Sequence, residues 1–94
     1  MPLFHVQTTS HFERDVRKLS RRNPQIVDLV DDLVYILKED PANVSRRHKI
    51  RKLEGVKQGE GQWRIRQGDY RLRYDIIGID VLLYSFRDRK DAYN

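Results

Sequence analysis

Two periodicities of apolar residues divide the chain. In the first half, apolar residues recur at helical spacing from Phe12 to Leu19, with charged residues outside the stripe. Ser10 stands three residues before Glu13, which is the spacing of a capping box at a helix N-terminus. The pattern therefore predicts a helix over residues 9–20.

A second and broader apolar face follows over residues 26–37. Asn23-Pro24 places a capping residue before a proline, which is favoured at the first helical position. Asp40-Pro41 ends the pattern, because the residue before a proline is pushed out of the helical region. These signals predict a second helix over residues 24–39, joined tightly enough to the first to pack antiparallel.

Alternation of apolar and polar side chains, which is typical of strands, occurs near the N-terminus and in the last third of the chain. It covers residues 3–8, 63–66 and 70–76, and a continuous apolar run typical of a central strand covers 81–86. Turns are predicted at Gly68-Asp69 and near Gly78. The order βααβββ predicts a single α+β domain over residues 1–94. Two antiparallel helices are expected to pack on one face of a mainly antiparallel four-stranded sheet.

Residues 41–61 connect the second helix to the last three strands and contain the basic run 46–52. A structureless loop of this length is uncommon in a compact domain, so part of it is expected to be ordered or functional. A short extended piece and a turn are both compatible with residues 52–55.

The two halves of the chain also differ in net charge. The 94 residues have a formal net charge of +5, with 6 basic and 7 acidic residues in 1–45 but 13 and 7 in 46–94. The absence of cysteine excludes disulfides, thiol nucleophiles and cysteine-based zinc sites. No apolar run approaches the ~20 residues that span a bilayer, and the N-terminus lacks a basic region followed by an apolar one. A cytoplasmic protein with no membrane partner is expected.

Arginine dominates one face of the predicted sheet. Alternation places Arg64, Arg66, Arg71 and Arg73 opposite the face that the helices cover. Side chains directly opposite on paired strands lie about 5 Å apart, so like charges there are destabilising unless an anion binds. Arginine binds phosphate through paired hydrogen bonds, and tyrosine stacks on unpaired bases. A solvated charged surface is the simpler interpretation, but this concentration favours a site for a polyanion.

Other kinds of site are not indicated. His5, His11 and His48 are isolated along the chain, and no carboxylate cluster has the spacing of metal ligands. The aspartates between residues 28 and 32 are explained as the solvent-exposed side of the second helix. Nucleophile motifs and phosphate-binding glycine loops are missing. No metal or other cofactor is therefore expected.

Three segments of the second half resemble the RelE/ParE superfamily of toxins from type II toxin–antitoxin systems. They read KLEG at 52–55, WRIRQGDYRLRY at 63–74 and FRDRKDAY at 86–93. Together with the order βααβββ, the resemblance covers nearly the whole chain and implies the RelE-like microbial ribonuclease fold. RelE-like members cut messenger RNA in the ribosomal A site, whereas ParE-like members inhibit DNA gyrase and lack the nuclease residues.

The resemblance favours the ribonuclease branch, because residues of suitable type occupy its functional positions. The catalytic positions fall on Arg64, Arg66, Arg71, Arg87 and Tyr93. Further RNA contacts are expected from Arg46, Arg47, Lys49, Arg51, Lys52, Arg73 and Arg89. The implied reaction is metal-independent attack of a ribose 2′-hydroxyl on the adjacent phosphate, which gives a 2′,3′-cyclic phosphate and a 5′-hydroxyl.

Each catalytic position has an implied role. Arg71 would hold the scissile phosphate, Arg66 would support its charge, and Arg87 would assist the leaving 5′-oxygen. Tyr93 would stack on a base or orient the nucleophile. RelE has lysines where Arg64 and Arg66 stand here, and one of those lysines is a candidate general base. Because arginine does not deprotonate in proteins, catalysis is mainly electrostatic, or Tyr93 or solvent takes the proton, or activity is weak.

The expected partners are a cognate antitoxin, messenger RNA and ribosomal RNA, with operator DNA contacted only through the antitoxin. Two alternatives remain open. One is a ParE-like toxin that inhibits gyrase, and the other is a non-catalytic RNA- or operator-binding partner of an antitoxin.

Overall fold

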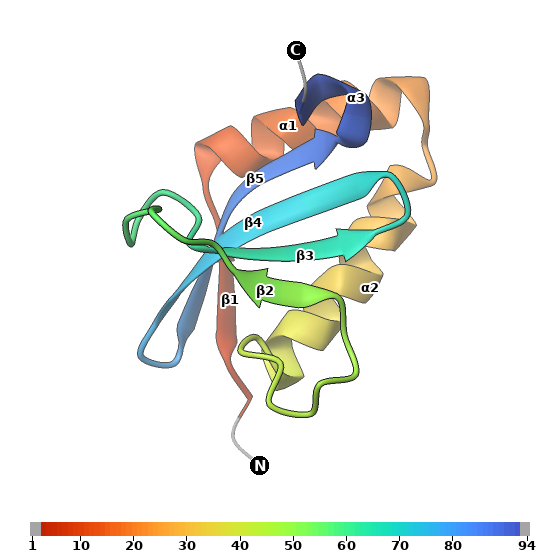
Figure 1. Ribbon diagram of the computed structural model, residues 1–94. Coiled ribbons are helices and arrows are strands. Elements are labelled where there is room, and N and C mark those ends of the chain that lie inside the picture. Colours follow the sequence, from red (N-terminus) through yellow and green to blue (C-terminus); the bar gives the residue numbers. More distant parts are fainter. Residues whose placement is uncertain (1–2, 93–94) are drawn as a thin grey trace.

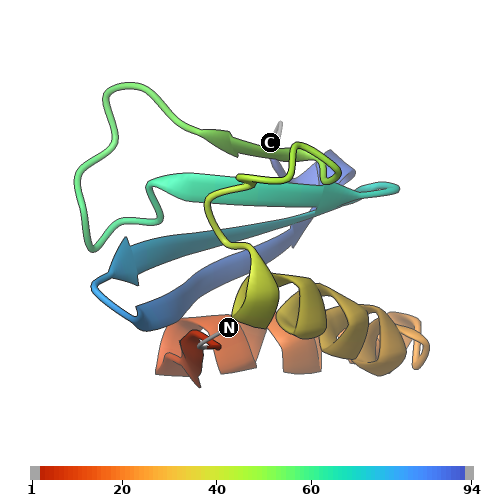
Figure 2. The same ribbon diagram turned by 90° about the horizontal axis from the view of Figure 1, so that it is seen from below.

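Two helices cover one face of a five-stranded mixed sheet (Figures 1 and 2). The computed structural model describes residues 3–92. The elements are β1 (His5–Thr8), α1 (Ser10–Arg22), α2 (Ile26–Glu39), β2 (Ile50–Lys52), β3 (Trp63–Gln67), β4 (Tyr70–Ile77), β5 (Asp80–Asp88) and α3 (Arg89–Ala92). The strand order is β1-β5-β4-β3-β2. β1 runs parallel to β5, and the other neighbouring strands are antiparallel.

The α+β class and the packing of both helices on one face are confirmed, but the predicted number of four strands is wrong. The additional strand is β2, which pairs antiparallel with β3 through Ile50↔Ile65 and Arg51↔Arg64. Three residues within a basic run show no readable alternation, so only the long-range pairing with β3 defines this strand. The two turns lie where they were expected, at Gly68-Asp69 and at Gly78.

The N-terminus of α1 is capped one residue earlier than the sequence indicates. Thr9 is the N-cap, and its Oγ1 accepts a hydrogen bond from the Phe12 amide at 3.2 Å. The same hydroxyl donates to the Leu83 carbonyl at 2.8 Å. Thr8 Oγ1 donates to the Glu13 carboxylate at 2.6 Å. The predicted cap at Ser10 is therefore wrong, because the preceding threonine can bond both to the helix and to β5.

The core lies between the helices and the sheet. Its buried apolar side chains are Phe12, Leu19, Ile26, Leu33, Leu37, Ile65, Leu72, Tyr74, Val81, Leu83 and Phe86. Tyr74 is fully buried, and its hydroxyl donates to the Pro41 carbonyl at 2.7 Å. Burial raises the pKa of Tyr74 far above its usual range, and the nearby Asp40 charge adds to this shift. The neutral hydroxyl therefore joins the sheet to the end of α2.

A buried carboxylate holds the loop before β3 against the sheet. Asp75, which is only 1% exposed, accepts hydrogen bonds from the Gly61 and Gln62 amides, both at 3.0 Å. Arg73 Nε donates to the Gly61 carbonyl at 3.0 Å, and Arg73 Nη2 donates to the Glu60 carbonyl at 2.7 Å. Neighbouring β4 side chains of opposite charge therefore bind successive peptide groups of the same loop.

A second carboxylate orders the loop after α2. Asp40 accepts hydrogen bonds from the Val44 amide at 2.7 Å and from the Ser45 amide and hydroxyl at 3.1 and 2.6 Å. Burial acts to raise the pKa of Asp40, but the bonds from Ser45 and Val44 and the charge of His48 hold it below its usual value. Asn43 bonds through its side chain to both the amide and the carbonyl of His48. Both contacts shape the segment that carries Arg46 and Arg47.

Gly61→Ala is expected to destabilise the protein more than Gly55→Ala. Both glycines have positive φ, +75° and +73°, so alanine is strained at either position. Only at Gly61 would the added Cβ meet other atoms, lying 2.9 Å from Arg73 Cβ and 3.0 Å from Tyr84 Cδ2. We expect a loss of about 1 kcal/mol for Gly55→Ala and a further ~1–3 kcal/mol for Gly61→Ala, measured by denaturant unfolding. Equal losses would show that the loop yields freely around Gly61.

Asp40→Asn is expected to destabilise the protein at neutral pH but not in acid. Because the folded pKa of Asp40 is lowered, the stability that its charge contributes is present above the unfolded pKa of about 4 and is lost as pH falls through the folded value. The difference in unfolding free energy between wild type and variant should therefore shrink between about pH 5 and pH 2. Asp31→Asn, on the exposed side of α2, is the control and should show no such convergence. A difference that persists undiminished at about pH 2 contradicts the assignment.

Candidate functional site

Two rows of arginine side chains cross the sheet on the face turned away from α1 and α2. One row joins Arg66, Arg71 and Arg87 on β3, β4 and β5, and the other joins Arg51, Arg64 and Arg73 on β2, β3 and β4. Directly paired residues project from the same face, and the intervening residues of β3 and β4 lie in the core. We call these six residues the arginine face.

The predicted cluster of Arg64, Arg66, Arg71 and Arg73 is therefore brought together by the strand register. Arg51 and Arg87 extend it at opposite ends, since Arg51 pairs with Arg64 and Arg87 pairs with Arg71. A cavity of about 290 Å³ beside β2 is lined by Lys49, Ile50, Arg51, Arg64 and Arg66. Lys49 therefore adjoins the arginine face at its β2 end.

The guanidinium groups of this face differ in their hydrogen-bond and ion-pair partners. Arg73 is bound to the loop carbonyls of Glu60 and Gly61, and its guanidinium also lies 5.7 Å from the centroid of the Tyr84 ring. Arg87 Nε lies 3.6 Å from a carboxylate oxygen of Asp15. In contrast, Nη1 of Arg71 is buried and makes no hydrogen bond within the part of the chain that the structure describes. A buried donor without a partner is costly, so a small shift of the Arg71 side chain that brings Nη1 to a bound anion would remove this cost.

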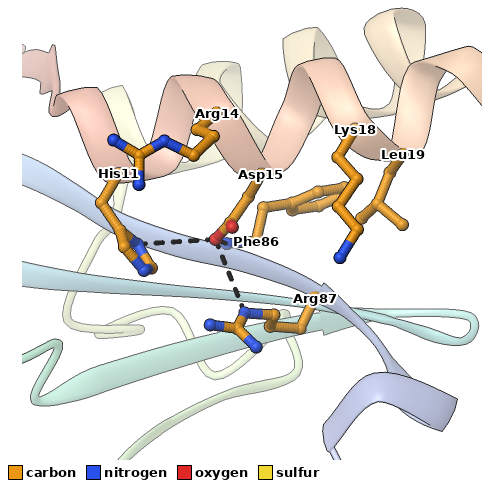
Figure 3. A pocket seen from close by; sticks show the side chains of 7 residues that line it. All are labelled: His11, Arg14, Asp15, Lys18, Leu19, Phe86 and Arg87. Atoms are coloured by element: carbon orange, nitrogen blue, oxygen red, sulfur yellow. Dashed lines mark hydrogen bonds and ion pairs between the residues drawn. The ribbon is translucent and has the colours of Figure 1, made fainter.

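A pocket of about 360 Å³ lies between α1 and β5, next to the arginine face (Figure 3). Its lining residues are His11, Arg14, Asp15, Lys18, Leu19, Phe86 and Arg87. His11 Nδ1 donates to the Tyr84 carbonyl at 2.9 Å and lies 3.6 Å from Asp15 Oδ2. That oxygen also accepts from the Phe86 amide at 3.0 Å and lies 3.6 Å from Arg87 Nε. Asp15 therefore links α1 to the end of the central arginine row.

No local sequence pattern predicts this cluster. His11 and Asp15 are four residues apart, which places them on one side of α1, but nothing in that spacing indicates contact with a strand more than 70 residues later. An irregularity in β5 completes the arrangement. Arg73 pairs with Ser85 and Tyr74 with Leu83, so Tyr84 is an extra residue in a β-bulge. The Tyr84 ring stacks on His11 with centroids 5.4 Å apart.

The remaining predicted site residues lie elsewhere. Lys52 does not join the arginine face, because it pairs with Trp63 and its ammonium lies 5.8 Å from that indole ring. Arg46 and Arg47 are exposed in the loop after α2. Arg89 is at the start of α3, where its amide donates to the Asp69 carbonyl. Tyr93 lies outside the described residues.

Within residues 3–92, no three histidine or acidic side chains gather into a cluster that could hold a metal ion. Over the same residues, no helix has the length and apolar character needed to cross a membrane. The site contains fixed positive charge, the buried Nη1 donor of Arg71 and an adjacent histidine. Such an arrangement can bind a phosphodiester and stabilise charge that develops on it.

Several solved structures with the same fold are of toxin–antitoxin complexes. One is the RelBE2 complex from Mycobacterium tuberculosis, which is 24% identical, has a TM-score of 0.70 and covers 93% of this chain and 99% of that one. Another is the DinJ–YafQ complex from E. coli, at 14% identity and a TM-score of 0.72, covering 97% and 98%. The RelB–RelE complex from Methanococcus jannaschii is 17% identical with a TM-score of 0.61 and covers 92% and 93%. A comparison with curated protein sequences found no match.

A family model assigns the chain more directly. The model for the ParE toxin of type II toxin–antitoxin systems, parDE, matches residues 6–93. This match includes every strand and helix except the first residue of β1, and therefore the whole arginine face. The chain belongs to the ParE toxin family within the RelE/ParE superfamily, and it is a toxin of a type II toxin–antitoxin system.

Proposed function

We propose that this toxin is a metal-independent endoribonuclease that cleaves messenger RNA on the ribosome and thereby inhibits translation. The observation that carries the proposal is Arg71, whose buried Nη1 makes no hydrogen bond among the described residues. Arg71 stands between Arg66 and Arg87 in the central row, so a phosphate over it would meet three guanidinium groups. Asp15 offsets part of the repulsion at Arg87, and a bound anion would relieve the repulsion that remains among these groups.

The reaction is transesterification within the RNA strand. The ribose 2′-oxygen attacks the adjacent phosphorus, the bond from phosphorus to the 5′-oxygen breaks, and the 2′-proton passes to solvent. The products are a 2′,3′-cyclic phosphate and a 5′-hydroxyl. Arg71 holds the scissile phosphate, Arg66 supports the extra negative charge of the transition state, and Arg87 stabilises the departing oxygen. Tyr93 keeps its proposed role of stacking on a base or orienting the nucleophile.

Arg64 completes the charge of the site but cannot act as its base, since arginine keeps its proton in proteins. The catalytic contribution of the arginine face is therefore positional and electrostatic. The electrostatic attraction between fixed cations and the transition state is stronger where water is excluded. Because the cations are already in place, they need no reorganisation during the reaction. The RNA strand extends beyond the cleaved bond. The second arginine row can therefore contact the phosphates that flank the scissile phosphate.

The basic residues on and beside the arginine face also indicate the binding partners of the toxin. Arg46, Arg47, Lys49 and Arg51 lie along or beside the β2 side, where they can contact backbone phosphates of messenger or ribosomal RNA without reading sequence. Lys52 and Arg89 contribute from outside the arginine face. The toxins in the similar structures are complexed with antitoxins, and we propose a cognate antitoxin for this chain too, with operator DNA contacted only through it. All of these partners are cytoplasmic.

A second candidate function is inhibition of DNA gyrase. The observation that favours it is the family match itself, which is to the ParE toxin. ParE-like inhibition needs a binding surface but no phosphate-bound arginine in the centre of the sheet. The two functions therefore differ in what they require of Arg71.

Arg71→Ala is expected to abolish growth arrest and messenger-RNA cleavage. Removing the central guanidinium takes away a charge-assisted bond to the transition state, which should slow cleavage by about 10²–10³-fold. Primer extension on cellular transcripts after induction measures the cut sites. Arg21→Ala, an exposed arginine in the last turn of α1, is the matched control and should cleave like wild type. Undiminished cleavage by a folded Arg71→Ala protein would contradict the proposal.

The order of cellular events separates the two candidate functions. If the toxin cleaves messenger RNA, incorporation of labelled amino acids should fall within minutes of induction, before any DNA-damage response is induced. If it inhibits gyrase, the damage response should come first while translation continues, and purified toxin should block supercoiling by gyrase. The second result overturns the ribonuclease proposal.

A further inference from the structure

His11 occupies the side of the arginine face where the proposed leaving group departs. The imidazole and Arg87 Nε both lie 3.6 Å from the same oxygen of Asp15, and both line the pocket between α1 and β5 (Figure 3). We propose that His11 is the general acid that protonates the departing 5′-oxygen of the RNA. This inference rests on the proposed ribonuclease function and adds a catalytic residue to it.

The protein fixes which nitrogen can transfer a proton. Nδ1 donates to the Tyr84 carbonyl at 2.9 Å, and a carbonyl can only accept, so Nδ1 carries a hydrogen in either charge state of the ring. Proton transfer therefore belongs to Nε2. Stacking on Tyr84, with ring planes 25° apart, holds the imidazole orientation. Asp15 is itself held by the Phe86 amide, so the whole arrangement is anchored to β5.

Arg87 alone cannot complete this half of the reaction. A guanidinium stabilises a developing oxyanion but does not give up its proton, whereas histidine gains and loses a proton near neutral pH. Both side chains line the same pocket, so a 5′-oxygen that enters it beside Arg87 also lies near the imidazole. The pocket of about 360 Å³ gives the nucleoside on the 3′ side of the cut a place to enter.

Of the three histidines, only His11 has this placement. His5 is on β1, where its Nδ1 contacts Asp80 at 3.2 Å, and His48 is in the loop after α2, 4.0 Å from Asp40. The charged groups around His11 come from three elements. They are Arg14, Asp15 and Lys18 on α1, Arg87 on β5, and Arg73 on β4, which lies over the Tyr84 ring.

The step balances with RNA, His11 and water. As the 2′-oxygen bonds to phosphorus, the bond from phosphorus to the 5′-oxygen breaks and its electron pair stays on that oxygen. The oxygen takes the proton from Nε2 of the imidazolium, and a water molecule accepts the proton of the 2′-hydroxyl. The neutral imidazole then regains a proton from water, which restores the starting state.

The test compares two messenger RNAs bound to ribosomes. The oxygen substrate is ordinary RNA, and in the sulfur substrate the 5′-bridging oxygen at the cut site is replaced by sulfur. A thiolate leaves without protonation, so a general acid is needed only for the oxygen substrate. His11→Asn keeps a donor for the Tyr84 carbonyl but cannot supply the proton. We expect it to cleave the oxygen substrate about 10²–10⁴-fold more slowly than wild type and the sulfur substrate at nearly the wild-type rate.

The controls separate chemistry from folding and from the proposed function. The matched control is His5→Asn, which changes the histidine of β1 that contacts Asp80 of β5, and it should cleave both substrates normally. His11→Gln, a second variant, should repeat the selective loss, and the unfolding temperatures of both His11 variants should match wild type. Equal losses on both substrates, or no loss, would overturn the role of His11, whereas a wild-type protein that cuts neither RNA would overturn the ribonuclease function itself.

Discussion

The pairing register of β3, β4 and β5 is the constraint on which the rest of the structure depends. Ile65 pairs with Leu72 and Leu72 with Phe86, and all three side chains are buried under the helices. A slip of one residue would turn this apolar row to the opposite face. Because the burial of the row resists such a slip, the arginines between its members are forced into alignment on the other face. Packing of the core thus fixes the geometry of the charged surface.

Concentrated positive charge has a cost that acidic residues partly offset. Asp15 approaches the arginine face from α1, and Asp75 lies within β4 itself. Asp15 also accepts a hydrogen bond from the Phe86 amide, and Asp75 accepts hydrogen bonds from amides of the loop before β3. The same carboxylates therefore lower the repulsion and anchor the chain around the site. The centre of the face, at Arg71, receives no such contact from the described residues.

Much of this organisation could be predicted from local patterns, and the failures have a common cause. Alternation around Ile65 and Leu72 was sufficient to place four arginines on one face, and helical spacing was sufficient to locate α1 and α2. Arg51 was predicted to contact RNA, but its place on the arginine face was missed, because β2 has only three residues and is defined by its pairing with β3. The cluster of His11, Asp15 and Arg87 was missed for a similar reason, since it joins the two ends of the chain. Local periodicity carries no information about such contacts.

The bulge at Tyr84 reverses the inside and outside of β5 along its length. Before it, odd-numbered residues such as Val81 and Leu83 enter the core, and after it the even-numbered Phe86 does so. The continuous apolar run at 81–86 therefore reflects a change of phase within the strand. Removing Tyr84, with the pairing on both sides kept, would restore regular alternation, leaving Phe86 in the core and Arg87 on the arginine face but taking away the ring that stacks on His11. The extra residue is therefore what lets one strand place an aromatic ring and a free carbonyl between His11 and Arg73 without disturbing the core on either side of it.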